Sequence, residues 1–392
     1  GETMRQVIAH EIGHALGLPH NMIASSSFPV DSLRSPTFTS EYGVAPTIMD
    51  YTRQNYIAQP GDGVTRFIRK IGPYDKYVIE WGYRWFPNVD EPADEKDELN
   101  ALVMEHAGDP MYRYSSGFGA YNPDAQTEDM GDDPVLAGTY AVANLQRVVP
   151  NLVDWTATDG KDYSDLDEIY GELLGMWNRY MNHVVTVVGG VYVTPKTTDQ
   201  EGVVYEVVPR EEQETAMQFL TENVFETPTW LLEDSLLRRI EHAGAVDRIR
   251  SRQVGILNNL LLPARLQRLI EAEVVDEADA YPLMAFMNDL KEGVWSELDD
   301  ARPAIDTYRR NLQRGYLERM EYLMTEEPDS RLAFFYGSVD VSQSDIRPLV
   351  RGQLKDLRDD SRRTARRTQD AATRYHLEDV ADRIDAMLDT GS

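Results

Sequence analysis

The 392-residue sequence contains no cysteine. Disulfide bonds, thiolate metal sites and cysteine nucleophiles are therefore excluded. A transition metal would have to be held by histidine and carboxylate side chains. The absence of cysteine also agrees with an extracytoplasmic location, in the periplasm, at the cell surface or secreted, although many cytosolic proteins are equally poor in cysteine.

Long apolar runs and positive charge are also scarce. The longest apolar run, residues 184–193, contains Thr186 and two glycines, and it falls short of the roughly 18 residues that a membrane span needs. Lys and Arg total 39 against 67 Asp and Glu, which gives a formal net charge of −28. Because a surface this acidic repels phosphate backbones, we expect neither a membrane span nor a nucleic-acid partner.

The stretch HEIGHALGLPH, residues 10–20, follows apolar residues at helical spacing. Residues four apart share one helix face, so His10 and His14 can offer two nitrogens to one ion. Gly17 allows the helix to end sharply, and His20 can then reach the same ion. Three neutral imidazoles leave a fourth position for water, which is the arrangement of a catalytic zinc site.

Glu11 directly follows the first of these histidines and can reach a water molecule at the metal, which makes it the candidate general base. A bare HExxH pattern also occurs by chance on amphipathic helices, and the histidines are then ordinary side chains. Here the glycine and the third histidine complete the longer pattern HExxHxxGxxH, and this favours the zinc site.

The completed motif resembles that of the metzincin clan of zinc peptidases, which carry a Met-turn beneath the metal. PTIMDY, residues 46–51, places Met49 29 positions after His20. The resemblance implies that this methionine packs below the imidazoles as an apolar floor. Tyr51 resembles the tyrosine of astacin-like and serralysin-like members that approaches the zinc as a ligand or stabilises the oxyanion. Asp50 departs from the histidine that astacin-like members often have there.

A closer resemblance is to the bacterial EcxA-like zinc peptidases. It rests on the zinc motif and on blocks at residues 47–62, 71–84, 128–134 and 225–232. The family implies extracytoplasmic peptidases with a region before the zinc helix, and in metzincins a sheet in that region binds the extended substrate. The chain opens at Gly1 without a visible signal peptide. We interpret it as a processed product or fragment and expect an upstream region of the same precursor as a partner.

Apolar residues recur at intervals of three and four through most of the chain, which predicts a mainly α fold. A short β-hairpin is expected from residues 190–193 and 203–208, around a polar turn. Residues 21–71 are expected as loops. Among the later helices, the pattern predicts single long helices over residues 246–273 and 345–388.

The length suits roughly two or three domains. Residues 1–125 are expected to form the C-terminal part of a metzincin-like catalytic domain, with the zinc helix and the Met-turn. Residues 126–243 are expected as a helical region with the hairpin, packed on the catalytic part. Residues 244–392 are expected as a C-terminal helical domain.

A second, weaker candidate site is an acidic loop. Clustered carboxylates on a loop can hold Ca²⁺, although the spacing does not match an EF-hand. The alternative is a solvated acidic turn whose aspartates cap the helix that starts near Val135. The candidate calcium ligands are Asp124, Asp129, Asp132 and Asp133.

The function expected from these residues is zinc-dependent endopeptidase activity on a peptide or protein. One alternative is a zinc-binding but inactive fragment or scaffold that lacks the upstream substrate-binding sheet. Another is hydrolysis of a non-peptide amide or ester, because the motif specifies an activated water and not the acyl group that it attacks.

Overall fold

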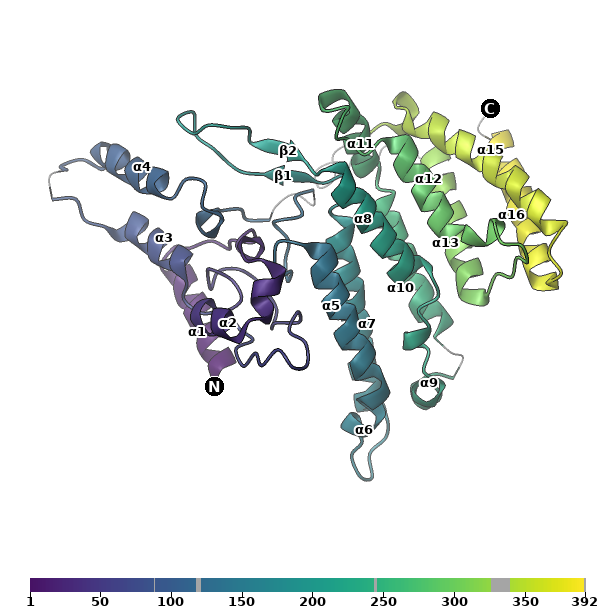
Figure 1. The fold of residues 1–392 in the computed structure, drawn as a ribbon, viewed down its shortest axis with the longest axis horizontal. Coiled ribbons are helices and arrows are strands. Elements are labelled where there is room, and N and C mark those ends of the chain that lie inside the picture. The colour runs from purple at the N-terminus through teal and green to yellow at the C-terminus, as the bar shows by residue number, and fades with distance from the viewer. Residues whose placement is uncertain (88, 118–120, 243–244, 326–338, 391–392) are drawn as a thin grey trace. The chain divides into compact units, whose positions relative to one another are not determined.

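The computed structural model describes residues 1–87, 89–117, 121–242, 245–325 and 339–390. Helices make up most of these ranges, and a single two-stranded sheet accompanies them (Figure 1). The expected mainly α fold is thereby confirmed. Within the same ranges, no helix combines the length and the apolar character that crossing a membrane requires.

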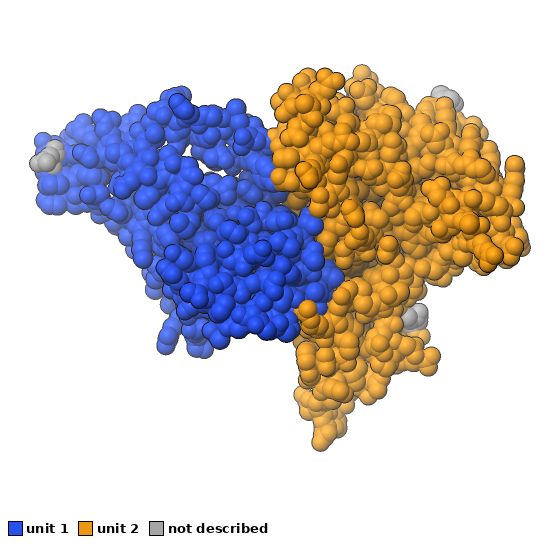
Figure 2. All heavy atoms as spheres, in the orientation of Figure 1, with its two compact units in different colours: residues 1–145, 191–206 blue, residues 146–190, 207–392 orange. Residues whose placement is uncertain are grey.

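The chain divides into two compact units (Figure 2). Unit 1 comprises residues 1–145 and 191–206, and unit 2 comprises residues 146–190 and 207–392. The candidate zinc and calcium ligands all belong to unit 1. The division into three segments that we expected from the sequence stays a prediction.

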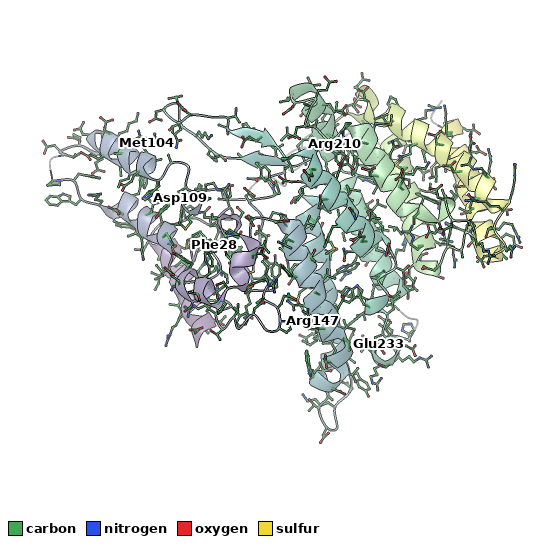
Figure 3. The ribbon with its side chains drawn as sticks, viewed as in Figure 1. Phe28, Met104, Asp109, Arg147, Arg210 and Glu233 are labelled. Carbon is green, nitrogen blue, oxygen red and sulfur yellow. The ribbon has the colours of Figure 1, made fainter. Side chains whose placement is uncertain are left out.

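Unit 1 is rich in loops and short helices. Its described helices are α1 (Glu2–Ala15), α2 (Pro36–Tyr42), α3 (Pro73–Tyr83), α4 (Lys96–Glu105) and most of α5 (Pro134–Val148), with 3-10 turns at Ser25–Ser27, Val30–Arg34, Pro92–Glu95 and Pro110–Tyr112. Its main apolar core is drawn from loops as much as from helices. That core contains Phe28 (labelled in Figure 3), Val30, Leu33, Val44, Ile57, Met130 and Ala137.

Helix α2 lies in the stretch that we expected to be loop. Its start has a clear local cause, because the Ser35 side chain accepts a hydrogen bond from the backbone of Phe38 at 3.2 Å and Pro36 occupies the first turn. Both residues are typical of helix N-termini. A serine followed directly by proline was therefore the sequence signal for this helix.

Side chains also order the loop that follows the Met-turn. The Asn55 amide donates to the carbonyl of Leu33 at 2.7 Å, and its oxygen accepts from the backbone of Ile57 at 3.1 Å. Arg34 donates twice to Asp62, at 2.9 and 2.8 Å, in the fork geometry that makes such pairs specific. These bonds hold the loop against residues 33 and 34.

Unit 2 is an array of helices in which α7, α10, α13, α15 and α16 each pack against the next (Figure 1). Its described helices are α6 (Leu152–Thr156), α7 (Ser164–Val185), α8 (Arg210–Leu220), α9 (Asp234–Ile240), α10 (Val246–Leu260), α11 (Pro263–Val275), α12 (Leu283–Val294), α13 (Thr307–Thr325), α15 (Ile346–Ala365) and α16 (Ala371–Thr390), with a π-turn at Thr221–Phe225.

Two helices that we expected to be continuous are each broken. The first breaks between α10 and α11, where Pro263 occupies the first turn of the new helix and cannot continue the old one. The second breaks between α15 and α16, where the Asp370 side chain accepts from the backbone of Thr373 at 2.7 Å and starts α16. The two halves then pack side by side, with Arg351 donating to the carbonyl of Leu388 at 3.3 Å.

The sheet consists of β1 (Val191–Val193) and β2 (Tyr205–Val207), close to the expected hairpin. The pairing continues past the strands, because the backbone of Thr194 donates to Val204 at 2.9 Å. The backbone of Val191 also donates to Tyr121 at 2.7 Å. The hairpin is thereby tied into unit 1.

Candidate metal centre

The first helix, α1, ends in a turn that reverses the chain. Gly17 has φ of +85°, a left-handed conformation that glycine adopts without a steric penalty. The backbone of Leu18 donates to the carbonyl of Gly13 at 3.0 Å, and that of Gly17 donates to His14 at 2.9 Å. These two bonds form a Schellman motif. It turns the chain so that His20 faces the helix that it has just left.

The three histidines of the motif converge. The candidate ligand nitrogens of His10, His14 and His20 all lie within 4.8 Å of one another. The Nε2 atoms of His14 and His20 are 3.0 Å apart. Two nitrogens that share one tetrahedral zinc at roughly 2.0–2.1 Å would be about 3.3 Å apart, so the observed spacing is close to that of a metal site.

Hydrogen bonds to backbone carbonyls orient two of the three imidazole rings and determine which ring nitrogen faces the centre of the histidine cluster. The Nδ1 of His10 lies 2.7 Å from the carbonyl oxygen of Ile48, and the Nδ1 of His14 lies 2.9 Å from that of Leu18. A carbonyl oxygen can only accept, so each Nδ1 carries a proton, and in the neutral ring the lone pair is on Nε2. Metal-ligating histidines are held in this way.

Burial and neighbouring side chains favour the neutral form of the His20 ring. The pKa of His20 lies below its usual value, first because burial penalises the charged ring and then because His14 and His10 stand beside it. Metal ligation requires the unprotonated ring. Among the described residues, these three form the one group of three or more acidic or histidine side chains that could hold a metal. A set of three imidazoles with a remaining open position fits Zn²⁺.

Met49 packs against α1 at Gly13, between the first two candidate ligands. Its side chain is fully buried and packs with Leu18 and Ile48. A β-carbon placed on Gly13 would clash with the sulfur of Met49. The glycine between the first two histidines therefore leaves the space that the methionine fills.

We expect Gly13→Ala to destabilise the protein by roughly 1–3 kcal/mol, because the added methyl group overpacks this contact. Gly255→Ala is a matched control, since Gly255 lies inside α10 with no atom within 4 Å of the added carbon. The control should be neutral or slightly stabilising. Urea unfolding measures both, and a Gly13→Ala variant as stable as the wild type would contradict the contact.

A buried carboxylate holds the Met-turn in place. Asp75 accepts hydrogen bonds from the Thr47 hydroxyl at 2.6 Å, from the backbone of Ile48 at 3.1 Å and from that of Gly72 at 2.8 Å. Our sequence analysis did not identify this residue as part of the site. The sequence feature that could have indicated Asp75 is Gly-Pro-Tyr-Asp, in which Asp75 is the third residue of a helix that begins with proline.

The two candidate catalytic side chains lie at the accessible side of the site. Glu11 is exposed on α1, one residue after His10. The Tyr51 side chain is 40% exposed, and its ring centroid lies 4.2 Å from that of His20 and 5.5 Å from that of His10. The structure thus brings Tyr51 against two of the three imidazoles.

Asp50 and Asp129 form a buried acidic pair next to the Met-turn. Asp50 accepts from the backbone of Ser25 at 2.8 Å, and Asp129 accepts from the hydroxyl of the same serine at 3.1 Å. Burial raises the pKa of Asp50 to about 7. Burial also raises the pKa of Asp129 well above its usual value, and the neighbouring Asp50 adds to this.

These raised pKa values predict how stability depends on pH. Between about pH 4 and 7 the folded chain keeps protons that the unfolded chain releases, so this pair contributes stability at low pH that is lost as the pH rises. Asp129→Asn removes one of the two buried charges. We therefore expect urea unfolding to show the variant more stable, relative to wild type, at pH 8 than at pH 5.

Asp97→Asn, on an exposed residue of α4, serves as the control and should give a difference that is independent of pH. If the stability difference between Asp129→Asn and wild type were equal at the two pH values, the buried pair would not carry the raised pKa values.

The structure does not support the expected calcium site. Asp124 pairs with Arg113 at 3.0 Å, and Asp132 accepts from the backbone of Val30 at 3.0 Å. Asp133 accepts from the backbone of the first turn of α5, and Asp129 bonds to Ser25. The four carboxylates are thus used separately. The alternative that we weighed, a solvated acidic turn with helix-capping aspartates, is correct only for the cap at Asp133, because Asp129 is buried.

A groove of about 930 Å³ lies within unit 1 and reaches Pro19, the neighbour of the third histidine. Aromatic side chains of α3, among them Tyr77 and Trp81, line one side of it. Met104 of α4 and Asp109, both labelled in Figure 3, contribute to another. The groove offers mostly apolar surface close to the histidine cluster.

Comparison with known proteins agrees with this geometry. A model of the Met-zincin family matches residues 1–302, which is more than half of the chain. No curated protein and no solved structure matches the chain. The family match implies zinc binding and points to a metallopeptidase that acts on proteins or peptides. The chain therefore belongs to the Met-zincin family.

Proposed function

We propose that this chain is a zinc-dependent endopeptidase in which His10, His14 and His20 hold the metal. The convergence of these three imidazoles around one point is the observation that supports this most strongly. Zinc, when bound, supplies Lewis acidity that makes water a nucleophile near neutral pH and polarises the scissile carbonyl.

Glu11 is the proposed general base. As an exposed carboxylate beside the first ligand, it can take the proton of the attacking water and pass it to the leaving amine. Tyr51 lies against His20 and His10, where its hydroxyl can donate a hydrogen bond to the developing oxyanion. The two side chains thus have separate tasks in one reaction.

The surroundings of the centre support a peptide substrate. The groove beside Pro19 has room for several apolar side chains. Helix α1 also leaves apolar side chains exposed along one side, with Met4 at 63%, Ile8 at 52% and Ile12 at 53% exposure. We propose that an upstream region of the same precursor packs on this face and supplies a strand that binds the extended substrate.

Within the metzincin clan, we propose that this chain is related to the EcxA-like peptidases. The proposal is based on the sequence blocks around the Met-turn and α3. An extracytoplasmic location is part of the same proposal. It is supported by the complete absence of cysteine and by the resemblance to that bacterial family.

One alternative function has an observation in its favour. Because the apolar face of α1 is exposed, the chain by itself could be a zinc-bearing scaffold without hydrolytic activity. The chain is incubated with an unfolded protein, once with zinc and once with a chelator, to distinguish the peptidase from the inactive scaffold. We expect cleavage that the chelator stops and added zinc restores, and a zinc-loaded chain that leaves the protein intact would refute the peptidase.

A panel of model esters and non-peptide amides, assayed in the same way, tests the other alternative. The proposal predicts that peptide bonds are cleaved faster than these compounds.

A further inference from the structure

A small pocket lies one helical turn before the first zinc ligand, between the N-terminal half of α1 and residues 66–71. Its volume is about 180 Å³. Gln6, in its wall, stands four residues before His10, about 6 Å along the helix axis. Another wall residue is Ile48, whose carbonyl oxygen lies within hydrogen-bond distance of both His10 and Arg69. Ile48 therefore links the pocket to His10 on the Nδ1 side of the imidazole ring.

The pocket is basic, in a chain whose net charge is −28. Arg5, Arg66, Arg69 and Lys70 line it, against the single carboxylate of Glu2. Glu2 pairs with Arg66 at 2.9 Å. In the part of the chain that the structure describes, the other three cations form no ion pair. Arg69 does interact electrostatically with the buried Asp50 and Asp75. The Lys70 ammonium donates to the backbone carbonyls of Ser40 and Glu41. A local positive field of this kind attracts anions that the remaining surface repels.

Several polar atoms of these side chains also lack partners. Among the described residues, the Nε atoms of Arg66 and Arg69 are buried without an acceptor, and Oε1 of Gln6 is buried without a donor. Buried polar groups are normally satisfied, so unmatched donors call for a partner. Arginine donors pair best with the two oxygens of a carboxylate, whereas Glu2 meets Arg66 through one contact only, between a terminal nitrogen of the guanidinium and Oε1.

We propose that this pocket binds a carboxylate of the substrate, either an Asp or Glu side chain near the scissile bond or the terminal carboxylate of a peptide. The inference rests on the proposed peptidase function and gives that function a substrate class. The pocket is large enough for one carboxylate side chain and too small for a folded partner.

Binding to the zinc-loaded Glu11→Gln variant tests the pocket without hydrolysis. The probes are fluorescent hexapeptides of three kinds. The first kind has an amidated C-terminus and one Glu, placed in turn at each of the six positions. The second is the matching Gln peptide with an amidated C-terminus, and the third is the Gln peptide with a free C-terminal carboxylate. We expect at least one carboxylate form to bind about tenfold more tightly than the amidated Gln peptide, since charge-assisted contacts of this kind carry such differences.

Removing the cations should remove this preference. In the same background, Arg5→Gln combined with Arg66→Gln is expected to bind all the peptides equally, whereas Arg5→Gln alone, at an exposed side chain, loses part of the preference. Arg84→Gln is the matched control, because Arg84 directly follows α3, lies outside the pocket and pairs with Glu80. None of these substitutions changes the histidines. A peptide whose carboxylate bound the zinc directly would therefore still bind more tightly than the amidated Gln peptide in these variants.

Tighter binding of a Glu peptide identifies the side-chain carboxylate as the ligand, and tighter binding of the peptide with the free C-terminus identifies the terminal carboxylate. Either result supports the pocket. Equal affinities, or a preference that survives without Arg5 and Arg66, overturn it. Cleavage of the amidated Gln peptide by the wild type is measured alongside. Cleavage without a carboxylate preference refutes the pocket alone, and a preference without cleavage of any peptide refutes the peptidase alone.

Discussion

The Glu11→Gln variant is expected to keep zinc and to lose peptide hydrolysis by about 10³-fold, because it removes the proposed general base and leaves the three imidazoles in place. Glutamine has nearly the same shape as glutamate but cannot accept a proton at neutral pH. Metal analysis and a peptide-cleavage assay on the same preparation measure both properties. The loss should appear in kcat, since the amide changes the reaction and not the walls of the groove.

Glu98→Gln is the matched control, as Glu98 is an exposed carboxylate on α4 away from the histidine cluster. It should cleave at the wild-type rate. If Glu11→Gln hydrolysed peptides as fast as this control, the proton acceptor would have to be another group.

The second large effect concerns the metal itself. His14→Ala is expected to lower the zinc content from about one equivalent to near zero, because two remaining imidazoles cannot close a three-ligand site. His14 has a central place, since its Nε2 lies 3.0 Å from that of His20 and its other nitrogen bonds to Leu18. Zinc should also raise the melting temperature of the wild type and leave that of the variant unchanged.

His106→Ala provides the comparison. His106 lies in the same unit and stacks on Tyr112, with centroids 3.8 Å apart, but it does not belong to the cluster. It should retain zinc. A His14→Ala variant with a full equivalent of zinc would mean that the metal lies elsewhere.

The histidine cluster could be predicted from the sequence because it is almost wholly local. His10 and His14 share a face through helix geometry alone, and Gly17 marks the turn that returns His20 to them. Met49 was predicted by resemblance and not by physics, since nothing in the spacing alone places a loop methionine beneath a helix. Its contact with Gly13 became visible in the structure.

Residues that act across long sequence separations were missed. Asp75 holds the Met-turn from a helix that starts 24 residues after Met49, and its carboxylate looks from the sequence like an ordinary helix-capping residue. The basic pocket was missed for the same reason. Arg5 and Arg66 are 61 positions apart, and only the fold brings them to the same pocket.

The helices of unit 2 show the limits of periodicity. Apolar spacing predicted their existence well, but it continued through the breaks at Pro263 and Asp370. Proline at position 263 was a readable stop signal. The second break was less visible, because the cap at Asp370 lies in a highly charged stretch where salt-bridged surface and turn have similar compositions.

X-ray absorption at the zinc edge is the most direct test of the metal centre. On the purified, zinc-loaded chain it should show three imidazole nitrogens at about 2.0–2.1 Å and one further light ligand. A first shell with fewer than three imidazoles, or one that is unchanged in the His14→Ala variant, would contradict the site on which the proposed hydrolysis depends.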